Sequence, residues 1–298
     1  MIWIIPVSLL LLLYSILIYY VTEIIVRPSL LDKDNKNLKP DIPETICYEE
    51  ITYYNRKIKL NAAVALTKHR PVANIIFIHG IRSNKNFYLA HCEPFLRAGF
   101  NCIFPDLRAH GKSGGKYTTY GFYEKMDIKL LIDFITKKYN LSAPVVAIGH
   151  SMGGAILLQT MEFDHRIKVG IAEAPFSSLY EVTCDYFKRK LKVSNKVLIK
   201  FILKNACKKA LFNYDRTVPL NSAKNIMAPV MLLHGNNDEK VPLKHSKKIY
   251  NHLNAHNRIL KIFDNTDHLS IQTNNTDEYY KLVINHLINI CEYAVNTK

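Results

Sequence analysis

A serine flanked by glycines is the feature whose residue types and spacing best suit chemistry. The pentapeptide 149–153 reads GHSMG and lies between the apolar runs 145–148 and 154–158. A G-x-S-x-G motif between a strand and a helix puts the serine on a sharp turn, where a base and a substrate can both reach it. The two glycines suit such a turn because its tight packing leaves no room for a Cβ. The motif predicts Ser151 as a nucleophile; a small-residue turn required only for packing is the alternative.

A carboxylate and an imidazole follow at the ends of later strand patterns. Asp238 lies in the loop after the apolar run 229–235, and His268 lies in the loop after the run 259–263. The chain order Ser, Asp, His is that of the α/β-hydrolase arrangement and differs from the orders in chymotrypsin and subtilisin. We expect His268 to take the serine proton and Asp238 to orient the imidazole. Glu239 is the alternative to Asp238, with the other carboxylate capping the following helix.

Two backbone amides are candidates for an oxyanion hole. The apolar run 74–78 ends in His79 and Gly80, and the glycine allows a turn that directs the amide of Ile81 to the nucleophile. The second donor is the amide of Met152. Such donors stabilise the charge that develops on a carbonyl oxygen, by about 3 kcal/mol each. We expect His79 to have a structural role in holding the turn.

The chain resembles the α/β-hydrolase superfamily, and within it the serine hydrolases that include monoacylglycerol-lipase-like and serine-aminopeptidase-like enzymes. The likeness covers about residues 44–297 and rests on His79-Gly80, 105–113, 149–154, His234-Gly235, Asp238, Val241-Pro242 and Asp267-His268. It implies hydrolysis through an acyl-enzyme without a metal or organic cofactor, and a structural role for the stretch 106–113. Acyltransferases, amidases and peptidases use the same triad, so the resemblance leaves the substrate open.

The elements around these motifs predict an α/β fold. Strand and helix patterns alternate, which is typical of a mostly parallel central sheet with helices on both faces. The expected strands include 46–53, 58–66, 102–104 and 169–172, the first two antiparallel, and the expected helices are 87–98, 123–139 and 278–295.

A lysine-rich segment interrupts the alternation. Residues 176–221 contain no strand pattern, and hydrolases of the resembled group often place a lid at this point. We expect a small helical lid there. Its lysines alternate with apolar residues, which suits either a solvated lid surface or contact with an anionic membrane.

The N-terminal segment predicts a membrane anchor. Residues 2–26 are almost uninterruptedly apolar and long enough to cross a hydrocarbon core. No Lys or Arg precedes the run and no small-x-small site follows it, which favours an anchor over a cleaved signal peptide. We expect an anchor over 1–27, a linker over 28–43 and a hydrolase domain over 44–298. Basic residues after the helix place the catalytic domain on the cytoplasmic side.

The net charge and the cysteine content indicate which classes of partner and metal site to expect. The net charge is +15, but the lysines are dispersed and no nucleic-acid-binding motif accompanies them. An anionic membrane surface suits this charge better than nucleic acid does. A general bias of the source organism's proteins toward lysine is the alternative explanation of the positive charge. The six cysteines show no C-x-x-C spacing, so we expect free thiols and no metal site; an extracytoplasmic domain with one or two disulfides is the alternative.

The sequence therefore predicts a membrane-anchored serine hydrolase that cleaves a carboxylic ester, with lipid-derived acyl esters among the candidates. An amidase, peptidase or acyltransferase with the same triad is the nearest alternative. A non-catalytic binding module with a hydrolase fold is the alternative from another class, but such a module usually lacks a triad member, and here all three candidates are present.

Overall fold

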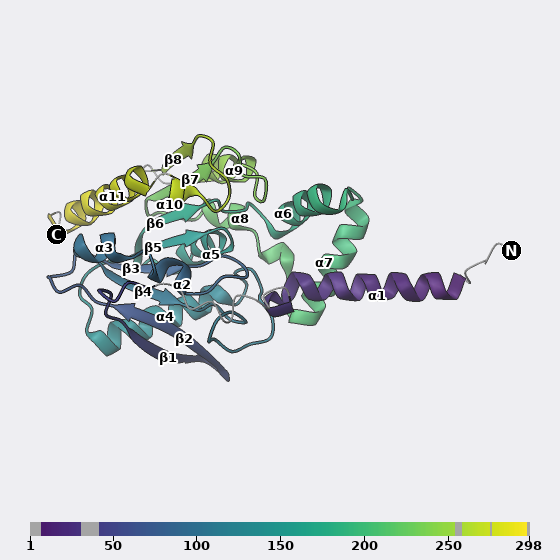
Figure 1. Cartoon of the computed structure of the whole chain (residues 1–298), viewed down its shortest axis with the longest axis horizontal. Helices are drawn as coiled ribbons and strands as arrows, with labels where there is room; N and C mark the ends of the chain where they lie inside the picture. The colour runs from purple at the N-terminus through teal and green to yellow at the C-terminus, as the bar shows by residue number, and fades with distance from the viewer. Residues whose placement is uncertain (1–6, 31–41, 254–257, 275, 297–298) are drawn as a thin grey trace.

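Eight strands form one sheet between two layers of helices (Figure 1). The computed structural model describes residues 7–30, 42–253, 258–274 and 276–296. The strands follow the spatial order β1-β2-β4-β3-β5-β6-β7-β8. Their bounds are β1 Glu49–Asn55, β2 Ile58–Ala65, β3 Asn74–Ile78, β4 Asn101–Pro105, β5 Val145–His150, β6 Ile167–Glu173, β7 Val230–Gly235 and β8 Arg258–Phe263.

The sheet is parallel from β4 to β8 and antiparallel only at the edge formed by β1 and β2. The prediction of a mostly parallel sheet is confirmed. Parallel strands joined by crossover helices have their carboxyl ends on one edge, where loops from different strands meet. This topology places the loops after β3, β5, β7 and β8 on the same edge.

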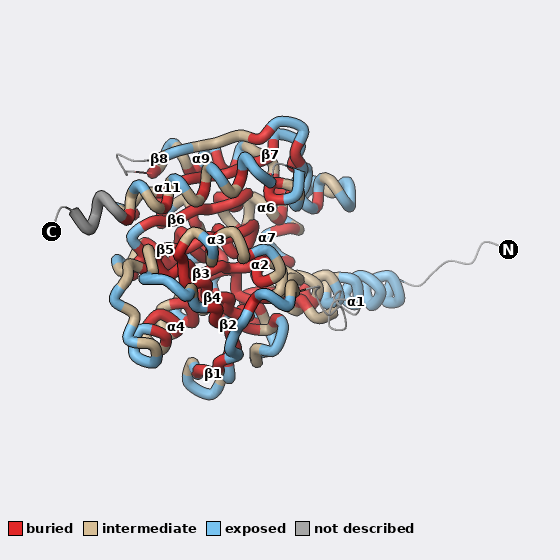
Figure 2. The backbone as a smooth tube through the Cα atoms, turned by 60° about the vertical axis from the view of Figure 1, so that its left-hand side comes forward, coloured by how far each residue is buried: buried red, intermediate tan, exposed pale blue. Residues whose placement is uncertain are grey.

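Each face of the sheet contributes to its own hydrophobic core. In β3, Ile76 and Ile78 pack on one side and Ile75 and Phe77 pack on the other, as the two-residue period of a strand requires. The first side is covered by α4 Glu124–Tyr139, α5 Met152–Met161, α8 Pro219–Ala223 and α9 Lys244–His252. The second is covered by α2 Asn86–Leu89, α3 Glu93–Arg97, α10 Ile271–Asn274 and α11 Thr276–Asn296. Burial is therefore concentrated along the strands (Figure 2).

The expected single helix over 87–98 is wrong, because this region forms the two short helices α2 and α3. Pro94 is the second residue of α3. A proline has no amide hydrogen and its ring clashes with the preceding turn, so it is tolerated only in the first turn of a helix. A new helix therefore begins beside Pro94. The expected helices 123–139 and 278–295 correspond to α4 and α11.

The lysine-rich segment is helical. It contains α6 Leu179–Tyr186, a π-helical turn Phe187–Leu191, α7 Lys196–Ala210 and a 3-10 turn Tyr214–Arg216 before α8. The Ser178 hydroxyl caps α6, and the Asn195 side chain caps α7 by accepting two amide hydrogens. On α7 one stripe is buried while Val197 and Phe201 remain exposed.

The N-terminal helix α1, Val7–Val26, projects away from the sheet, and α7 packs beside it (Figure 1). Its outer part is exposed, whereas Thr22, Glu23 and Val26 are buried against the body (Figure 2). Glu23 forms an ion pair with Lys209 of α7. α1 is long and apolar enough to cross a membrane, a property that N-terminal signal sequences share. Residues 1–6 of the expected anchor and 31–41 of the expected linker lie outside the described residues.

Candidate active site

Ser151 occupies a strained turn between β5 and α5. Its φ is +55° and its ψ is −115°, a backbone conformation that L-residues rarely adopt. The flanking glycines make this turn possible: a Cβ on Gly153 would collide with the carbonyl of Ile78, and a Cβ on Gly149 would collide with the backbone of Gly153. The turn therefore holds the serine at the carboxyl edge of the sheet, at the start of a helix, as in a nucleophile elbow.

His268 connects Ser151 to Asp238. Its Nε2 lies 2.9 Å from Ser151 Oγ, and its Nδ1 lies 2.6 Å from Asp238 Oδ2. The serine follows β5, the aspartate follows β7 and the histidine follows β8, so three strand ends supply the three groups. We call Ser151, His268 and Asp238 the elbow triad.

Asp238 is held in one orientation. Its Oδ1 accepts the amide hydrogens of Lys240 and Val241 at 2.9 and 2.8 Å, which leaves Oδ2 for His268. Burial alone would raise the pKa of Asp238, but hydrogen bonds from His234 and His268 outweigh that effect and hold the pKa well below its usual range. The carboxylate is therefore ionised near neutral pH. Glu239, the alternative acid, is exposed.

The two candidate oxyanion donors flank the serine. A Cβ on Gly80 would lie 3.4 Å from Ser151 Cβ, so the turn that carries Ile81 packs directly against the nucleophile. Met152 is the first residue of α5, where a helix leaves its amide without an intrahelical acceptor. This arrangement suits stabilisation of a negative charge beside Ser151.

Comparison with known proteins identifies the family. Residues 69–221, just over half of the chain, match the serine aminopeptidase, S33, family. The chain belongs to the serine aminopeptidase S33 family. It is therefore a serine hydrolase with the α/β-hydrolase fold, as the sequence motifs predicted.

Proteins similar to this S33 protein come from several different organisms. It is 28% identical over 227 residues to the uncharacterized protein YqkD of Bacillus subtilis, which covers 74% of this chain and 73% of YqkD. It is 25% identical over 193 residues to human protein ABHD12B, which covers 62% of this chain and 51% of that protein. Among solved structures, the Pyrococcus furiosus esterase Pf2001 has a TM-score of 0.68 at 24% identity, covering 82% of this chain and 92% of the esterase. The last comparison shows a shared fold.

Two histidines that the sequence did not single out as catalytic support the S33 site. His150 lies in the motif itself: its Nε2 is 2.8 Å from the carbonyl oxygen of His268, and the two rings are 4.8 Å apart. His79 accepts the amide hydrogen of Leu107 and contacts the carbonyl of Gly80. Burial lowers the pKa of each to about 3, so both rings are neutral. Only the position of His150 beside the serine could have drawn attention to it.

The stretch 106–113 packs beside the oxyanion turn. Asp106 accepts hydrogen bonds from the backbone and side chain of Lys85, at 2.8 Å each, and Arg108 forms two 2.7 Å hydrogen bonds with Asp127. A Cβ on Gly111, whose φ is +50°, would collide with Asp106. These contacts fix the loop shape and involve none of the triad atoms.

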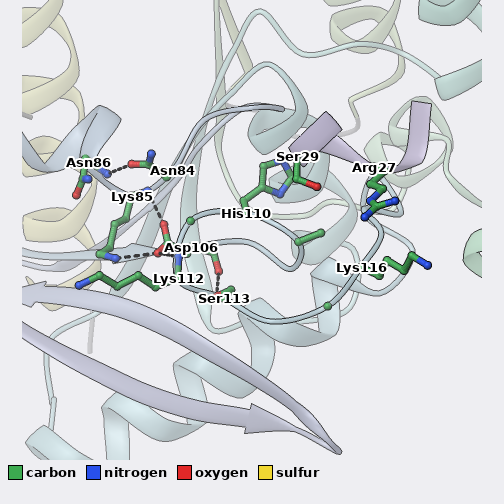
Figure 3. Close-up of a pocket in the computed structure, with 13 residues that line it drawn as sticks. Arg27, Ser29, Asn84, Lys85, Asn86, Asp106, His110, Lys112, Ser113 and Lys116 are labelled. Atoms are coloured by element: carbon green, nitrogen blue, oxygen red, sulfur yellow. Dashed lines mark hydrogen bonds and ion pairs between the residues drawn. The ribbon is translucent and has the colours of Figure 1, made fainter. Parts of the chain in front are cut away.

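A polar cavity of about 490 Å³ lies between this stretch and the end of α1 (Figure 3). Arg27 and Lys116 lie together at one end, and the Lys85–Asp106 pair lies at the other. None of the three triad residues lines the cavity. It is therefore separate from the triad, although Asn84 to Asn86, shortly after the oxyanion turn, form one wall.

A second group of Ser, His and Asp lies at the base of the lysine-rich segment. Ser177 Oγ is 2.7 Å from His245 Nδ1, and His245 Nε2 is 2.9 Å from Asp185 Oδ2. Glu181 Oε2 lies 2.6 Å from the same serine hydroxyl. We call Ser177, His245 and Asp185 the lid-base triad. Sequence reasoning missed it because no motif surrounds the serine.

Two further features of the part of the chain that is described concern metal-ligating side chains and cysteines. Within that part, no three His, Cys, Asp or Glu side chains gather as potential metal ligands. All six cysteines are free thiols; Cys92, Cys102, Cys207 and Cys291 are buried, whereas Cys47 is exposed.

Proposed function

We propose that this protein is a membrane-anchored serine hydrolase that cleaves carboxylic esters, with lipid-derived acyl esters among its substrates. The observation that carries the proposal is the continuous line of hydrogen bonds from Ser151 through His268 to Asp238, at 2.9 and 2.6 Å. The strained turn at Ser151 and the ionised Asp238 support the same roles.

In the proposed reaction, Ser151 Oγ attacks the ester carbonyl carbon while His268 Nε2 takes the hydroxyl proton. The amides of Ile81 and Met152 stabilise the oxyanion of the tetrahedral intermediate. His268 then gives the proton to the leaving alcohol, and the acyl group remains on the serine. Water, activated by the same imidazole, releases the acid and regenerates the hydroxyl. Asp238 fixes the imidazole tautomer and stabilises its positive charge.

A lipid substrate is supported by the surface around α1. Helix α7 packs beside α1 and also contacts α6 (Figure 1), so a membrane crossed by α1 would lie close to this segment. Leu191, Val197 and Phe201 are 50%, 79% and 52% exposed, and lysines surround them in the sequence. Apolar side chains among cations suit the interface of an anionic bilayer. We propose that this segment, within residues 176–221, is a lid that contacts the membrane.

The proposed organisation is an anchor over 1–27, a linker over 28–43 and a hydrolase domain over 44–298 on the cytoplasmic side. The support is the length of α1 together with the basic residues that follow it. A reporter fused after Lys298 that is active only in the cytoplasm is the expected result. A reporter active only outside the cytoplasm contradicts the orientation.

A fluorophosphonate probe tests the catalytic proposal. We expect purified wild-type protein to be labelled and to hydrolyse p-nitrophenyl esters. Ser151→Ala and His268→Ala should lose labelling, and kcat should fall by about 10⁴-fold or more, because serine and histidine act as one unit. Ser177→Ala is a matched control that also removes a hydroxyl beside a histidine, and it should be labelled like the wild type.

The outcomes separate the alternatives. A folded wild type that is neither labelled nor active contradicts the proposed function and favours a non-catalytic hydrolase fold. Labelling that survives Ser151→Ala contradicts the assignment of the nucleophile. Esters of increasing chain length measure the acyl preference, and faster cleavage of the matching p-nitroanilides would favour the amide hydrolysis that the aminopeptidase family name implies.

A further inference from the structure

Glu173 is a buried carboxyl group that the proposed reaction does not use. It is the last residue of β6 and has no solvent exposure. Its carboxylate accepts hydrogen bonds from Tyr88 Oη at 2.9 Å, from Tyr279 Oη at 2.5 Å and from Gln272 Nε2 at 3.1 Å. Among the described residues, no lysine or arginine pairs with it. Neutral donors alone therefore compensate its burial.

Two of these donors come from segments that carry parts of the candidate site. Tyr88 lies on α2, which follows the oxyanion turn, and Gln272 lies on α10, four residues after His268. The backbone carbonyl of Glu173 itself accepts the amide hydrogen of Ser151 at 2.7 Å. Glu173 thus touches the serine directly and reaches the other two segments through one hydrogen bond each.

We propose that Glu173 is a positioning residue that holds the serine turn, the oxyanion turn and the histidine loop in one mutual arrangement. The inference rests on the proposed function. A buried carboxyl group with three directional donors fixes its neighbours more strictly than apolar contacts do, because hydrogen bonds require a defined geometry and a buried polar group left without its partner is destabilising. Reacting groups require such precision, since a displacement of about 1 Å can cost up to 100-fold in rate.

Tyr279 supplies a matched control within the same cluster. It donates the same kind of bond to the same carboxylate, but it lies on α11, which carries no candidate site residue. Burial raises the pKa of Glu173, while the bonds from Tyr279, Tyr88 and Gln272 act in the opposite direction. Loss of any one donor therefore leaves the buried carboxyl group with one hydrogen bond fewer. Only the loss of Tyr88 or Gln272 releases a segment of the site.

The test compares Tyr88→Phe, Gln272→Leu and Tyr279→Phe in the full-length protein. For p-nitrophenyl acetate we expect Tyr88→Phe and Gln272→Leu to lower kcat by about tenfold with KM unchanged, because the displaced groups act in the reaction rather than in binding. All three variants should have a lower Tm than the wild type. In Tyr279→Phe, however, kcat should stay within about twofold of the wild-type value. Glu173→Gln should resemble Tyr88→Phe, and fluorophosphonate labelling rates should follow kcat in every variant.

Two outcomes overturn the inference. One is that all variants keep the wild-type kcat. The other is that kcat falls equally in all of them, Tyr279→Phe included, since that pattern indicates only a general loss of stability. A wild type that is neither labelled nor active refutes the proposed function itself, so the two failures are distinguishable.

Discussion

The elbow triad and the lid-base triad contain the same three residue types at nearly the same distances. In the elbow triad the imidazole lies 2.9 Å from the hydroxyl and 2.6 Å from the aspartate; in the lid-base triad the distances are 2.7 and 2.9 Å. The nitrogens are reversed, since Nε2 faces the serine in the first and Nδ1 faces it in the second. Distances alone therefore do not distinguish a nucleophile from a structural hydroxyl.

The surroundings of the two serines differ more than their triads. Ser151 is 8% exposed at a strained turn, whereas Ser177 has no exposure. The hydroxyl of Ser177 also has the Glu181 carboxylate as an acceptor. The amides of Ser177 and Leu179 are already bonded, to His245 and to Thr217. The lid-base serine is thus shielded from solvent, and these two neighbouring amides are not available to an oxyanion. Under the proposed function, backbone geometry and access, rather than the three side chains alone, distinguish Ser151 from Ser177.

Replacing the aspartate of each triad should give the sharpest contrast. Asp238→Asn should lower kcat by about 10⁴-fold, because the amide stabilises the wrong tautomer of His268. Asp185→Asn should leave hydrolysis of p-nitrophenyl acetate within about threefold of the wild type and lower the Tm, since Asp185 binds both His245 and Lys244 on α9. Steady-state kinetics and thermal unfolding measure both.

The neighbouring carboxylate provides the control for this contrast. Glu239→Gln changes an exposed residue next to Asp238 and should alter neither kcat nor the Tm appreciably. If Asp238→Asn kept its turnover while Glu239→Gln lost it, the assignment of the acid would have to move to Glu239. If Asp185→Asn abolished turnover of the short ester, the distinction between the two triads would not hold.

A smaller effect concerns acid stability. Burial lowers the pKa of His150, beside the elbow triad, to about 3 and lowers the pKa of His245 in the lid-base triad. Below about pH 6.5 the unfolded chain binds protons on these histidines, whereas the folded protein does not. The free energy of unfolding therefore has its full value above that pH and falls as the pH decreases. For His150 the loss should be about 1 kcal/mol between pH 7 and pH 5.5.

Urea unfolding at pH 7 and pH 5.5 measures this loss of stability. The variants His150→Gln and His245→Gln separate the contribution of the histidine beside the elbow triad from that of the histidine in the lid-base triad. Each variant should reduce the pH dependence, His150→Gln by about 1 kcal/mol over this interval. If His150→Gln kept the full wild-type pH dependence, the ring would not be held neutral in the folded protein.

Much of the fold was predictable because its signals are local. Apolar runs followed by glycine marked β3, β5 and β7, and the alternation of strands and helices predicted a mostly parallel sheet. The exception was 87–98, where α2 ends at Leu89 and Pro94 lies in the first turn of a new helix although the apolar spacing continues. Apolar spacing reports the buried side of a segment, and the lack of an amide hydrogen at a single proline overrides it.

The sequence by itself determined the candidate nucleophile, the order of the three candidate groups and the glycines without which the turn at Ser151 could not form. These follow from motifs a few residues long, in which backbone sterics admit one solution. The tertiary structure decided which carboxylate faces His268, why Ser177 is shielded although its triad is complete, and how Glu173 joins three segments. Those features depend on contacts between residues 30 to 106 positions apart, such as His268 with Asp238 and Tyr279 with Glu173. Only the strand order and the register of the sheet bring such residues together.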